Sequence, residues 1–393
     1  MNVLITGGAG FIGRYVTRLC LARGDNVIVL DNFSPQIHGR RDSGVLECEF
    51  RDFVNGNCIS PDRLQIVRGD VATENVWSAV RSDLDAVVHL AAETGTGQSM
   101  YEISRYERVN LGGTALLFES LVKGRFPRVK KLVLASSRAV YGEGKYRCAG
   151  CGDIYPPMRS SGALRAGQFE PHCPICQGPC SAVPTDEASP TSASSFYGLT
   201  KLVQESMVGL FPDLLGISAY CLRFQNVYGP AQALRNPYTG ILAIFSNLAR
   251  ANEAINVFED GKESRDFVYV DDVAWATCRC LDGSLTGVHT LNIGSGEAVA
   301  VSDVVAAVIR FFGSNSVVNT TGQFRVGDIR HCVADIARAR QVLGFVPKVR
   351  FEEGLRQFLT WASTQPLEQS HYEQSLSEMR EKGMMGSAIS TQL

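Results

Sequence analysis

A glycine-rich turn near the start of the chain constrains the fold more than any other feature. The turn is Gly7-Gly8-Ala9-Gly10-Phe11-Ile12-Gly13, between a strand-like apolar run over residues 2–6 and a helical pattern over residues 11–23. A second apolar run covers residues 26–30 and ends at Asp31. Glycines at these spacings let a backbone approach a pyrophosphate at a helix N-terminus. The sequence therefore predicts a dinucleotide site, against the alternative of an ordinary tight turn.

The acid that ends the second run indicates which dinucleotide is bound. Asp31 lies where a carboxylate accepts hydrogen bonds from the adenine ribose hydroxyls, and its charge repels a 2′-phosphate. We therefore expect NAD rather than NADP. The cofactor-binding residues that we predict are Gly7, Gly10, Phe11, Ile12, Gly13, Asp31, Asn32, Asp70, Val71, Leu90, Ala91, Ala92, Asn110, Tyr197 and Lys201.

Strand-like and helical segments alternate further along the chain. Strand-like runs cover residues 64–68, 85–90, 131–135 and 218–223. Parallel strands separated by helices form a doubly wound sheet whose ligands lie at the carboxyl ends of the strands. We therefore predict an α/β fold of the Rossmann type, with a smaller C-terminal substrate domain and a zinc-ribbon-like insert.

The 393 residues allow more than one domain. We assign residues 1–142, 186–228 and 266–292 to a discontinuous NAD-binding domain and residues 143–185 to the insert. The predicted substrate domain covers residues 229–265 and 293–362. The polar segment 363–393 lacks core patterning, so we predict a mobile tail there.

A tyrosine and a lysine are spaced so that both lie on one face of a helix. Tyr197 precedes Lys201 by one helical turn. An ammonium beside a phenol favours the phenolate, which makes Tyr197 a candidate proton acceptor. Ser137 ends a predicted strand, where its hydroxyl can reach a substrate. The alternatives are an exposed surface pair for the tyrosine and lysine, and a helix N-cap for the serine.

Five of the twelve cysteines are clustered in the insert, between Cys148 and Cys180. Four of them have the spacing Cys-x2-Cys-x21-Cys-x2-Cys, which is typical of a tetrahedral zinc site. These predicted ligands are Cys148, Cys151, Cys173 and Cys176. Four thiolates leave no open coordination position, so the zinc would be structural. The alternatives are unpaired reduced thiols, a redox pair, or exchange of one ligand for Cys180 or His172.

Composition excludes several other classes of protein. The formal net charge of −2 gives no reason to expect nucleic acid or an anionic membrane surface as a partner. No stretch approaches the roughly 18 apolar residues of a membrane span. Because Met1 leads directly into a strand-like run, we expect a cytoplasmic protein.

Several ordered motifs resemble those of one known family. They are Thr6-Gly-Gly-Ala-Gly-Phe-Ile-Gly13, His89-Leu-Ala-Ala92, Ser136-Ser137-Arg-Ala-Val-Tyr-Gly142, Tyr197-x-x-x-Lys201, Arg223-Phe-Gln-Asn-Val-Tyr-Gly-Pro230, Arg265-Asp-Phe-Val-Tyr-Val-Asp-Asp272 and Arg325-Val-Gly-Asp328. Together they resemble the extended short-chain dehydrogenase/reductase family, and more closely its nucleotide-sugar epimerase/dehydratase branch.

This resemblance implies roles for individual residues. Ser137, Tyr197 and Lys201 would form a catalytic trio. Arg265 and Arg325 would hold the diphosphate of a nucleotide sugar, which suits the planar guanidinium. The resemblance also implies a homodimer. The substrate-binding residues that it implies are Ser137, Asn226, Arg265, Arg325 and Asp328.

The two residues after Ser137 distinguish between members of the branch. Dehydratases carry an acid pair there for water elimination, whereas this chain has Arg138 and Ala139. We therefore expect a 4-epimerase, which needs only one base. The cysteine insert and the run over residues 89–99 resemble one group, the dTDP-L-rhamnose 4-epimerases, which make dTDP-6-deoxy-L-talose. The alternatives are a UDP-hexose 4-epimerase and a non-catalytic NAD-binding scaffold.

Overall fold

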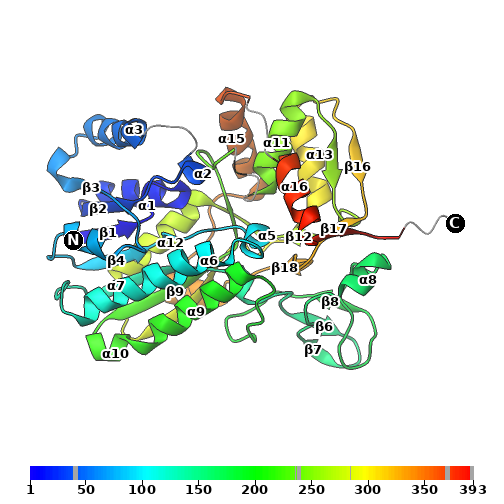
Figure 1. The fold of residues 1–393 in the computed structure, drawn as a ribbon, viewed down its shortest axis with the longest axis horizontal. Helices are drawn as coiled ribbons and strands as arrows, with labels where there is room; N and C mark the ends of the chain where they lie inside the picture. The colour runs from blue at the N-terminus through cyan, green and yellow to red at the C-terminus, as the bar shows by residue number, and fades with distance from the viewer. Residues whose placement is uncertain (39–42, 235, 237–239, 284, 368–371, 390–393) are drawn as a thin grey trace.

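The main sheet of the computed structural model contains parallel strands only (Figure 1). The structure describes residues 1–38, 43–234, 236, 240–283, 285–367 and 372–389, and within them this sheet has seven strands in the order β14-β9-β5-β4-β1-β2-β3. Their bounds are β1 (Asn2–Thr6), β2 (Asn26–Asp31), β3 (Leu64–Arg68), β4 (Ala86–His89), β5 (Lys131–Ser137), β9 (Ser218–Phe224) and β14 (Val288–Ile293). The predicted parallel α/β sheet is confirmed.

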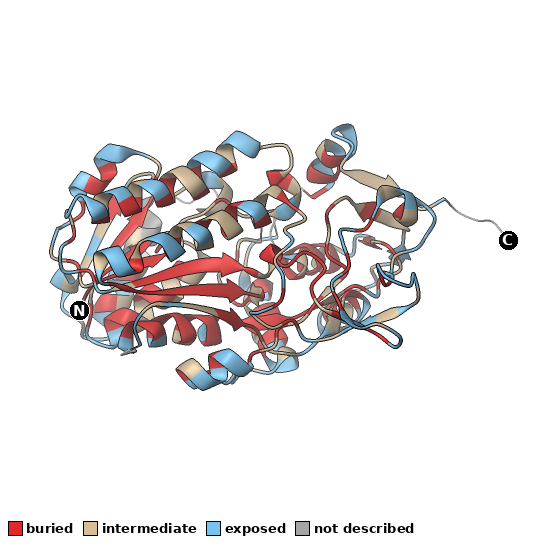
Figure 2. Ribbon diagram, turned by 90° about the horizontal axis from the view of Figure 1, so that it is seen from below, coloured by how far each residue is buried: buried red, intermediate tan, exposed pale blue. Residues whose placement is uncertain are grey.

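Apolar side chains alternate between the two faces of this sheet, and helices cover both. In β1, Val3 and Ile5 pack on one face and Leu4 on the other. The first face is covered by α1 (Phe11–Ala22), α3 (Ser43–Gly56), α12 (Val270–Asp282) and α14 (Ala337–Leu343). The opposite face is covered by α4 (Glu74–Ala79), α7 (Gly113–Val122), α9 (Phe196–Leu210) and α10 (Pro212–Leu215). Figure 2 shows the buried strands between helices whose outward turns are exposed.

Strand β14 was not predicted from the sequence. It lies at the edge of the sheet and pairs only with β9 among the described strands. His289, Thr290 and Asn292 interrupt its apolar pattern, because an edge strand needs less apolar surface than a central one. The remaining short helices and turns around this sheet are α2 (Pro35–His38), η1 (Pro61–Arg63), α5 (Thr96–Ser99), α6 (Ile103–Tyr106), η2 (Glu107–Gly112) and η3 (Arg138–Val140).

A second core lies beyond the carboxyl ends of the main strands. It is built on α11 (Ile241–Ala251), α13 (Val301–Phe312) and α15 (Phe351–Thr364). Short strands surround it: β10 (Asn226–Tyr228), β11 (Ile255–Val257), β12 (Ser264–Arg265), β13 (Phe267–Tyr269), β15 (Val299–Ala300), β16 (Val318–Thr320), β17 (Gln323–Arg325) and β18 (His331–Cys332). Among the described residues, no helix combines the length and apolar character needed to span a membrane.

The C-terminal segment is packed, in contrast to the mobile tail that we predicted. It forms α16 (Tyr372–Glu381) and β19 (Met385–Ser387), and β19 pairs antiparallel with β17. Leu376 and Met379 are buried in the second core. The polar composition hid this because α16 buries only one face. The parts of the prediction over 368–371 and 390–393 lie outside the described residues.

The cysteine-rich insert forms a small antiparallel sheet of its own, at the lower right of Figure 1. Its strands are β6 (Tyr146–Cys148), β7 (Gly152–Ile154) and β8 (Cys180–Ala182), in the order β7-β6-β8. Helix α8 (Ser161–Arg165) completes it. The insert connects η3, which follows β5, to α9.

Candidate active site

One cavity of about 420 Å³ lies at the carboxyl ends of the main strands. The glycine turn, the strand-ending Asp31, and the tyrosine–lysine face of α9 all line it. The strands β1 and β4 are neighbours there although β2 and β3 lie on the other side of β1. Such a reversal of strand order is where open α/β sheets bind ligands.

The glycine turn is too crowded for side chains. Gly7 has a φ of +68°, and a Cβ added to it would lie 2.8 Å from the Ala91 nitrogen. A Cβ at Gly13 would lie 2.1 Å from the Gly7 carbonyl oxygen. The turn therefore needs glycine at both positions, and it presents backbone to the cavity at the start of α1, as a bound pyrophosphate requires.

Asp31 keeps the turn and the next loop in place with its carboxylate. One oxygen accepts a hydrogen bond from the Ala9 amide at 3.1 Å, and the other from the Phe33 amide at 2.8 Å. The His38 Nε2 lies 3.3 Å from the second oxygen. Because a carboxylate has about four lone-pair sites, Asp31 keeps capacity to accept from a ribose hydroxyl. His38 also lines the cavity, and no sequence motif had indicated it.

Fourteen of the fifteen predicted cofactor residues line the cavity, and Asn110 does not. Asn110 is fully buried, and its side chain connects the loop at Glu93 to helix α9. Its Nδ2 donates to the Glu93 carbonyl at 3.1 Å and to the Thr200 hydroxyl at 2.9 Å. Asn110 therefore acts on the cavity indirectly, because it holds the backbone of Glu93, and Glu93 lines the cavity.

Two caps and a close backbone contact bring Ser137 and Tyr197 into the same cavity. The Ser137 hydroxyl caps η3 by accepting from the Ala139 amide at 3.2 Å, and Ser195 caps α9. A Cβ at Gly198 would lie 2.4 Å from the Ala139 carbonyl oxygen, so glycine there lets α9 approach η3. Ser137 thus has the capping contact that was the alternative to a catalytic role, and it also lines the cavity beside Tyr197.

The pKa values of both ionisable groups of the trio are shifted, in opposite directions. Burial lowers the pKa of Lys201 to about 7, although Glu205 opposes the shift. Burial raises the pKa of Tyr197, and the Ser137 hydroxyl and the Arg138 guanidinium oppose that shift. We expected Lys201 to lower the pKa of Tyr197, but the groups that lower it here are Ser137 and Arg138. The Lys201 Nζ lies 5.9 Å from the tyrosine ring centroid and donates to the Ala135 carbonyl at 2.9 Å.

The structure therefore adds Arg138 to the site. It follows Ser137 directly and lines the cavity with Tyr197. In the sequence it was notable only because it replaces an acid. Its charge also acts on the pKa of the Cys332 thiol, which it lowers against the larger effect of burial.

Three of the predicted substrate residues, Arg265, Arg325 and Asp328, form one cluster, and of these three only Asp328 lines the cavity. Asn226 and Asp328 line the cavity itself. Arg325 donates to the Asp328 carboxylate at 2.6 Å, and Arg265 donates to it at 3.3 Å. Burial opposes ionisation of Asp328, but Arg325 and Arg265 hold its pKa well below the usual range. Arg265 and Arg325 are thus gathered around one carboxylate, and the charge of Glu263 also acts on both of them.

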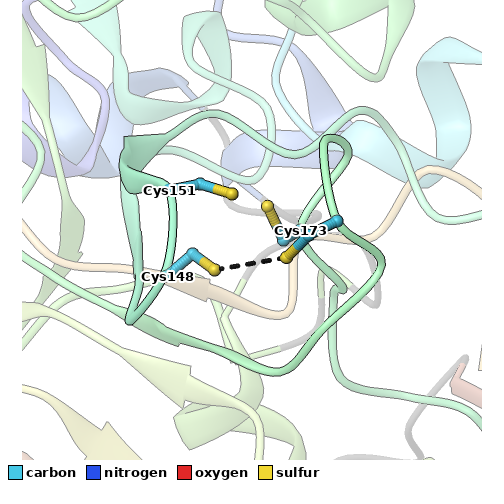
Figure 3. Close-up of side chains that lie close together, drawn as sticks. Cys148, Cys151 and Cys173 are labelled. Carbon is cyan, nitrogen blue, oxygen red and sulfur yellow. Dashed lines mark hydrogen bonds between the residues drawn. The ribbon is translucent and has the colours of Figure 1, made fainter.

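The four predicted metal ligands converge in the insert (Figure 3). The Sγ atoms of Cys148, Cys151, Cys173 and Cys176 all lie within 4.8 Å of one another. Cys148 and Cys151 lie on the β6–β7 turn, and the other two precede β8. Backbone amides of Cys176 and Ile175 help to lower the pKa of the Cys173 thiol to about 7. Thiolates arranged in this way fit a tetrahedral zinc ion.

The spare ligand candidates lie outside this cluster. The Cys180 thiol donates to the Pro171 carbonyl at 3.1 Å, and His172 is exposed. The turns beside the two cysteine pairs contain left-handed residues at Gly152, with a φ of 77°, and at Gln177, with a φ of 60°.

Comparisons with known proteins agree with this geometry. The NAD dependent epimerase/dehydratase family matches residues 3–159 and 176–294. The dTDP-L-rhamnose 4-epimerase of Burkholderia thailandensis is 37% identical over 92% of this chain and 94% of its own length.

Solved structures of epimerases have the same fold. The UDP-glucose 4-epimerase of Thermotoga maritima, solved with UDP-glucose, has a TM-score of 0.71 and 27% identity over 92% of this chain and 99% of its own. The UDP-glucose 4-epimerase of Thermus thermophilus, solved with NAD, has a TM-score of 0.69 and 26% identity over 93% of this chain and 100% of its own.

Proposed function

Because the chain belongs to the NAD-dependent epimerase/dehydratase family, we propose that it is an NAD-dependent nucleotide-sugar 4-epimerase. One observation carries the proposal: a single cavity is lined by the glycine turn, Asp31, Ser137 and Tyr197. The substrate that we propose is dTDP-L-rhamnose, converted to dTDP-6-deoxy-L-talose. The name of the Burkholderia relative supports this choice.

The glycine turn and Asp31 would hold NAD. The turn supplies backbone for the pyrophosphate at the start of α1, and Asp31 accepts from the adenine ribose. Bound NAD would supply the hydride acceptor for C4 of the sugar and the donor for its re-reduction on the opposite face. The Lys201 ammonium would contact the nicotinamide ribose. The crowding at the glycine turn and the hydrogen bond from the Ala9 amide to Asp31 support the roles proposed for the turn and for Asp31.

Tyr197 would take the proton from the sugar 4-hydroxyl and later return it. Burial raises the pKa of Tyr197, and the Ser137 hydroxyl and the Arg138 guanidinium oppose this and so favour the phenolate. Ser137 would also donate to the developing keto oxygen. General acid–base catalysis of this kind contributes about 10²- to 10⁴-fold.

Asn226, Arg265 and Arg325 would hold the diphosphate, so that the 4-keto sugar turns over while its nucleotide stays fixed. The convergence of Arg265 and Arg325 on the carboxylate of Asp328, which lines the cavity, supports this assignment. Two guanidinium groups suit a diphosphate because each can donate two parallel hydrogen bonds. Asp328 would lie near the nucleotide ribose.

The four cysteines of the insert would bind one structural zinc ion. The convergence of the sulfur atoms supports this, and a redox pair would not need two Cys-x2-Cys pairs. Structural zinc contributes about 10–16 kcal/mol to the folding of small segments. The insert is such a segment, with a core of only a few buried side chains. A homodimer and a cytoplasmic location stay predictions from the sequence.

A panel of nucleotide sugars tests the function. The purified protein is incubated with dTDP-L-rhamnose, UDP-glucose and UDP-galactose, and C4 inversion is followed by NMR. We expect inversion of dTDP-L-rhamnose without consumption of added NADH. Inversion of a UDP-hexose alone would favour the UDP-hexose 4-epimerase, and no turnover of any sugar would favour the scaffold.

A further inference from the structure

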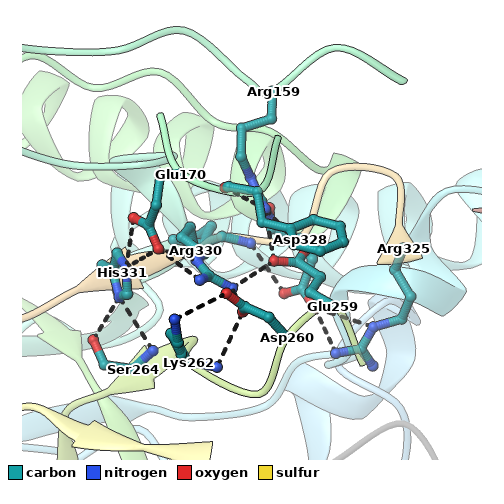
Figure 4. Close-up of polar contacts among 12 residues, drawn as sticks. Arg159, Glu170, Glu259, Asp260, Lys262, Ser264, Arg325, Asp328, Arg330 and His331 are labelled. Atoms are coloured by element: carbon teal, nitrogen blue, oxygen red, sulfur yellow. Dashed lines mark hydrogen bonds and ion pairs between the residues drawn. The ribbon is translucent and has the colours of Figure 1, made fainter. Parts of the chain in front are cut away.

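A buried arginine of the insert reaches the predicted substrate site. Arg159 is 8% exposed and lies in the loop between the two cysteine pairs (Figure 4). Its Nε donates to the Glu143 carboxylate at 2.9 Å, and its Nη1 to Glu259 at 2.9 Å. Its Nη2 donates to the Asp328 main-chain oxygen at 2.9 Å. One guanidinium therefore joins the insert to two segments of the second core.

The contact with Asp328 connects Arg159 to the predicted substrate-binding arginines. The carboxylate of the same residue accepts from Arg265 and Arg325. Arg159 holds the main chain of Asp328, whereas the other two arginines hold its side chain. A shift of this main chain would move the carboxylate and both guanidinium groups together.

A second ionic contact joins the same two parts of the protein. Arg330, which is completely buried, donates to Glu170 of the insert and to Glu259 at 2.9 Å each. The Arg330 amide donates to Glu143 at 2.8 Å. Arg159 and Arg330 thus share Glu143 and Glu259, and charges buried in this way are costly to move apart.

The position of the contact in the chain connects it to the cysteine cluster. Arg159 and Glu170 both lie in the segment between Cys151 and Cys173, and this segment begins and ends at the clustered sulfur atoms. It is anchored at both ends by the cysteine pairs and in the middle by the ionic contacts.

We propose that Arg159 is a positioning residue for the substrate diphosphate, and that the insert is thereby part of the substrate site. This rests on the proposed function, in which Arg265 and Arg325 bind the diphosphate. Arg159 holds the main chain of Asp328 in the position from which the Asp328 carboxylate orients Arg265 and Arg325. It is not among the residues that line the cavity with Tyr197, so it sets substrate affinity and leaves the chemical step unchanged.

Binding of nucleoside diphosphates tests this without turnover. The purified enzyme with its bound NAD and metal is titrated with dTDP and with UDP by calorimetry, and the tighter ligand is used for comparison. Arg159→Lys keeps the charge opposite Glu143 and Glu259, but an ammonium lacks the forked donors that reach Asp328 as well. We expect the Kd to rise about tenfold, since hydrogen bonds to charged groups contribute on that scale.

Kinetics separate positioning from catalysis and from folding. For Arg159→Lys we expect KM to rise with Kd, while kcat stays within about twofold and the NAD content is unchanged. The matched control is Arg147→Lys, in the same insert, whose partner is the exposed Asp153; it should leave Kd unchanged. If Arg159→Lys does not fold, Glu259→Gln weakens the same contact from the other side and should raise Kd in the same way.

Three results would overturn the inference. An unchanged Kd in folded Arg159→Lys, even with a lower melting temperature, would make the contact merely structural. A lower kcat at unchanged KM would place its effect on Tyr197. Wild-type enzyme that binds neither dTDP nor UDP would refute the proposed diphosphate site itself, which distinguishes that failure from the first two.

Discussion

Lys201 should destabilise the cofactor-free protein at neutral pH, and removing its charge should make the protein more stable. Its pKa falls from 10.5 to about 7 because the ammonium is buried. Each pKa unit corresponds to about 1.4 kcal/mol, so the whole shift corresponds to a cost on the order of 5 kcal/mol. Lys201→Met fills similar space without charge and removes this cost, while activity should be lost.

The sign of the pH dependence follows from the direction of the shift. The folded pKa lies below the unfolded value, so the unfolded chain binds more protons between pH 7 and 10.5. The stability of the wild type therefore rises with pH across this window. Below about pH 7 the ammonium is present in both states, and the full cost applies. The advantage of Lys201→Met should thus be largest near pH 7 and smaller at pH 9.

Melting temperatures of the NAD-free proteins at pH 7, 8 and 9 measure this advantage. The control is Lys123→Met, because Lys123 is exposed and paired with Glu119, which raises its pKa. The difference between wild type and Lys123→Met should not change over this range. If Lys201→Met is no more stable than the wild type, or if its advantage is equally large at pH 7 and pH 9, burial of the Lys201 ammonium does not destabilise the protein as argued.

Three further outcomes are expected. Tyr197→Phe should lower kcat at least about 100-fold, the scale of general-base catalysis, with NAD content unchanged; near-normal turnover would place the base elsewhere. Because Asp31 repels a 2′-phosphate, the purified protein should contain NAD, measured after heat release, and equal activity with NADP would contradict this. Metal analysis should give one zinc per chain, and Cys173→Ser should lose it together with activity but keep NAD, whereas Cys58→Ser, at an exposed thiol, should behave as wild type. Zinc-free active enzyme would contradict the metal site.

The parts of the site that the sequence predicted are those that depend on neighbouring residues. The turn from Gly7 to Gly13 is recognised by the spacing of its glycines within seven residues, and Tyr197 and Lys201 are recognised by their helical spacing. The cysteine pairs are also local, and their spacing was enough to predict that they meet. In each case the signal is a short motif with a fixed spacing.

The parts that the sequence did not predict depend on contacts between distant segments. Arg159 meets Asp328 across 169 residues of chain, and nothing near either residue indicates the contact. The same holds for Arg138, whose effect on Tyr197 appears only once η3 and α9 are packed together. The C-terminal helix α16 was missed because one buried face in a polar segment is a weak signal.

The pairing of β19 with β17 has a consequence for synthesis of the chain. Arg325 at the end of β17 pairs opposite Met385, so the ribosome must make almost the whole chain before this strand has its partner. Chains fold during translation from the N-terminus onward. The cofactor half can therefore form while the nascent substrate half is still incomplete. A stop codon just after α15 should release a chain that still takes up NAD but has an unsupported Arg325.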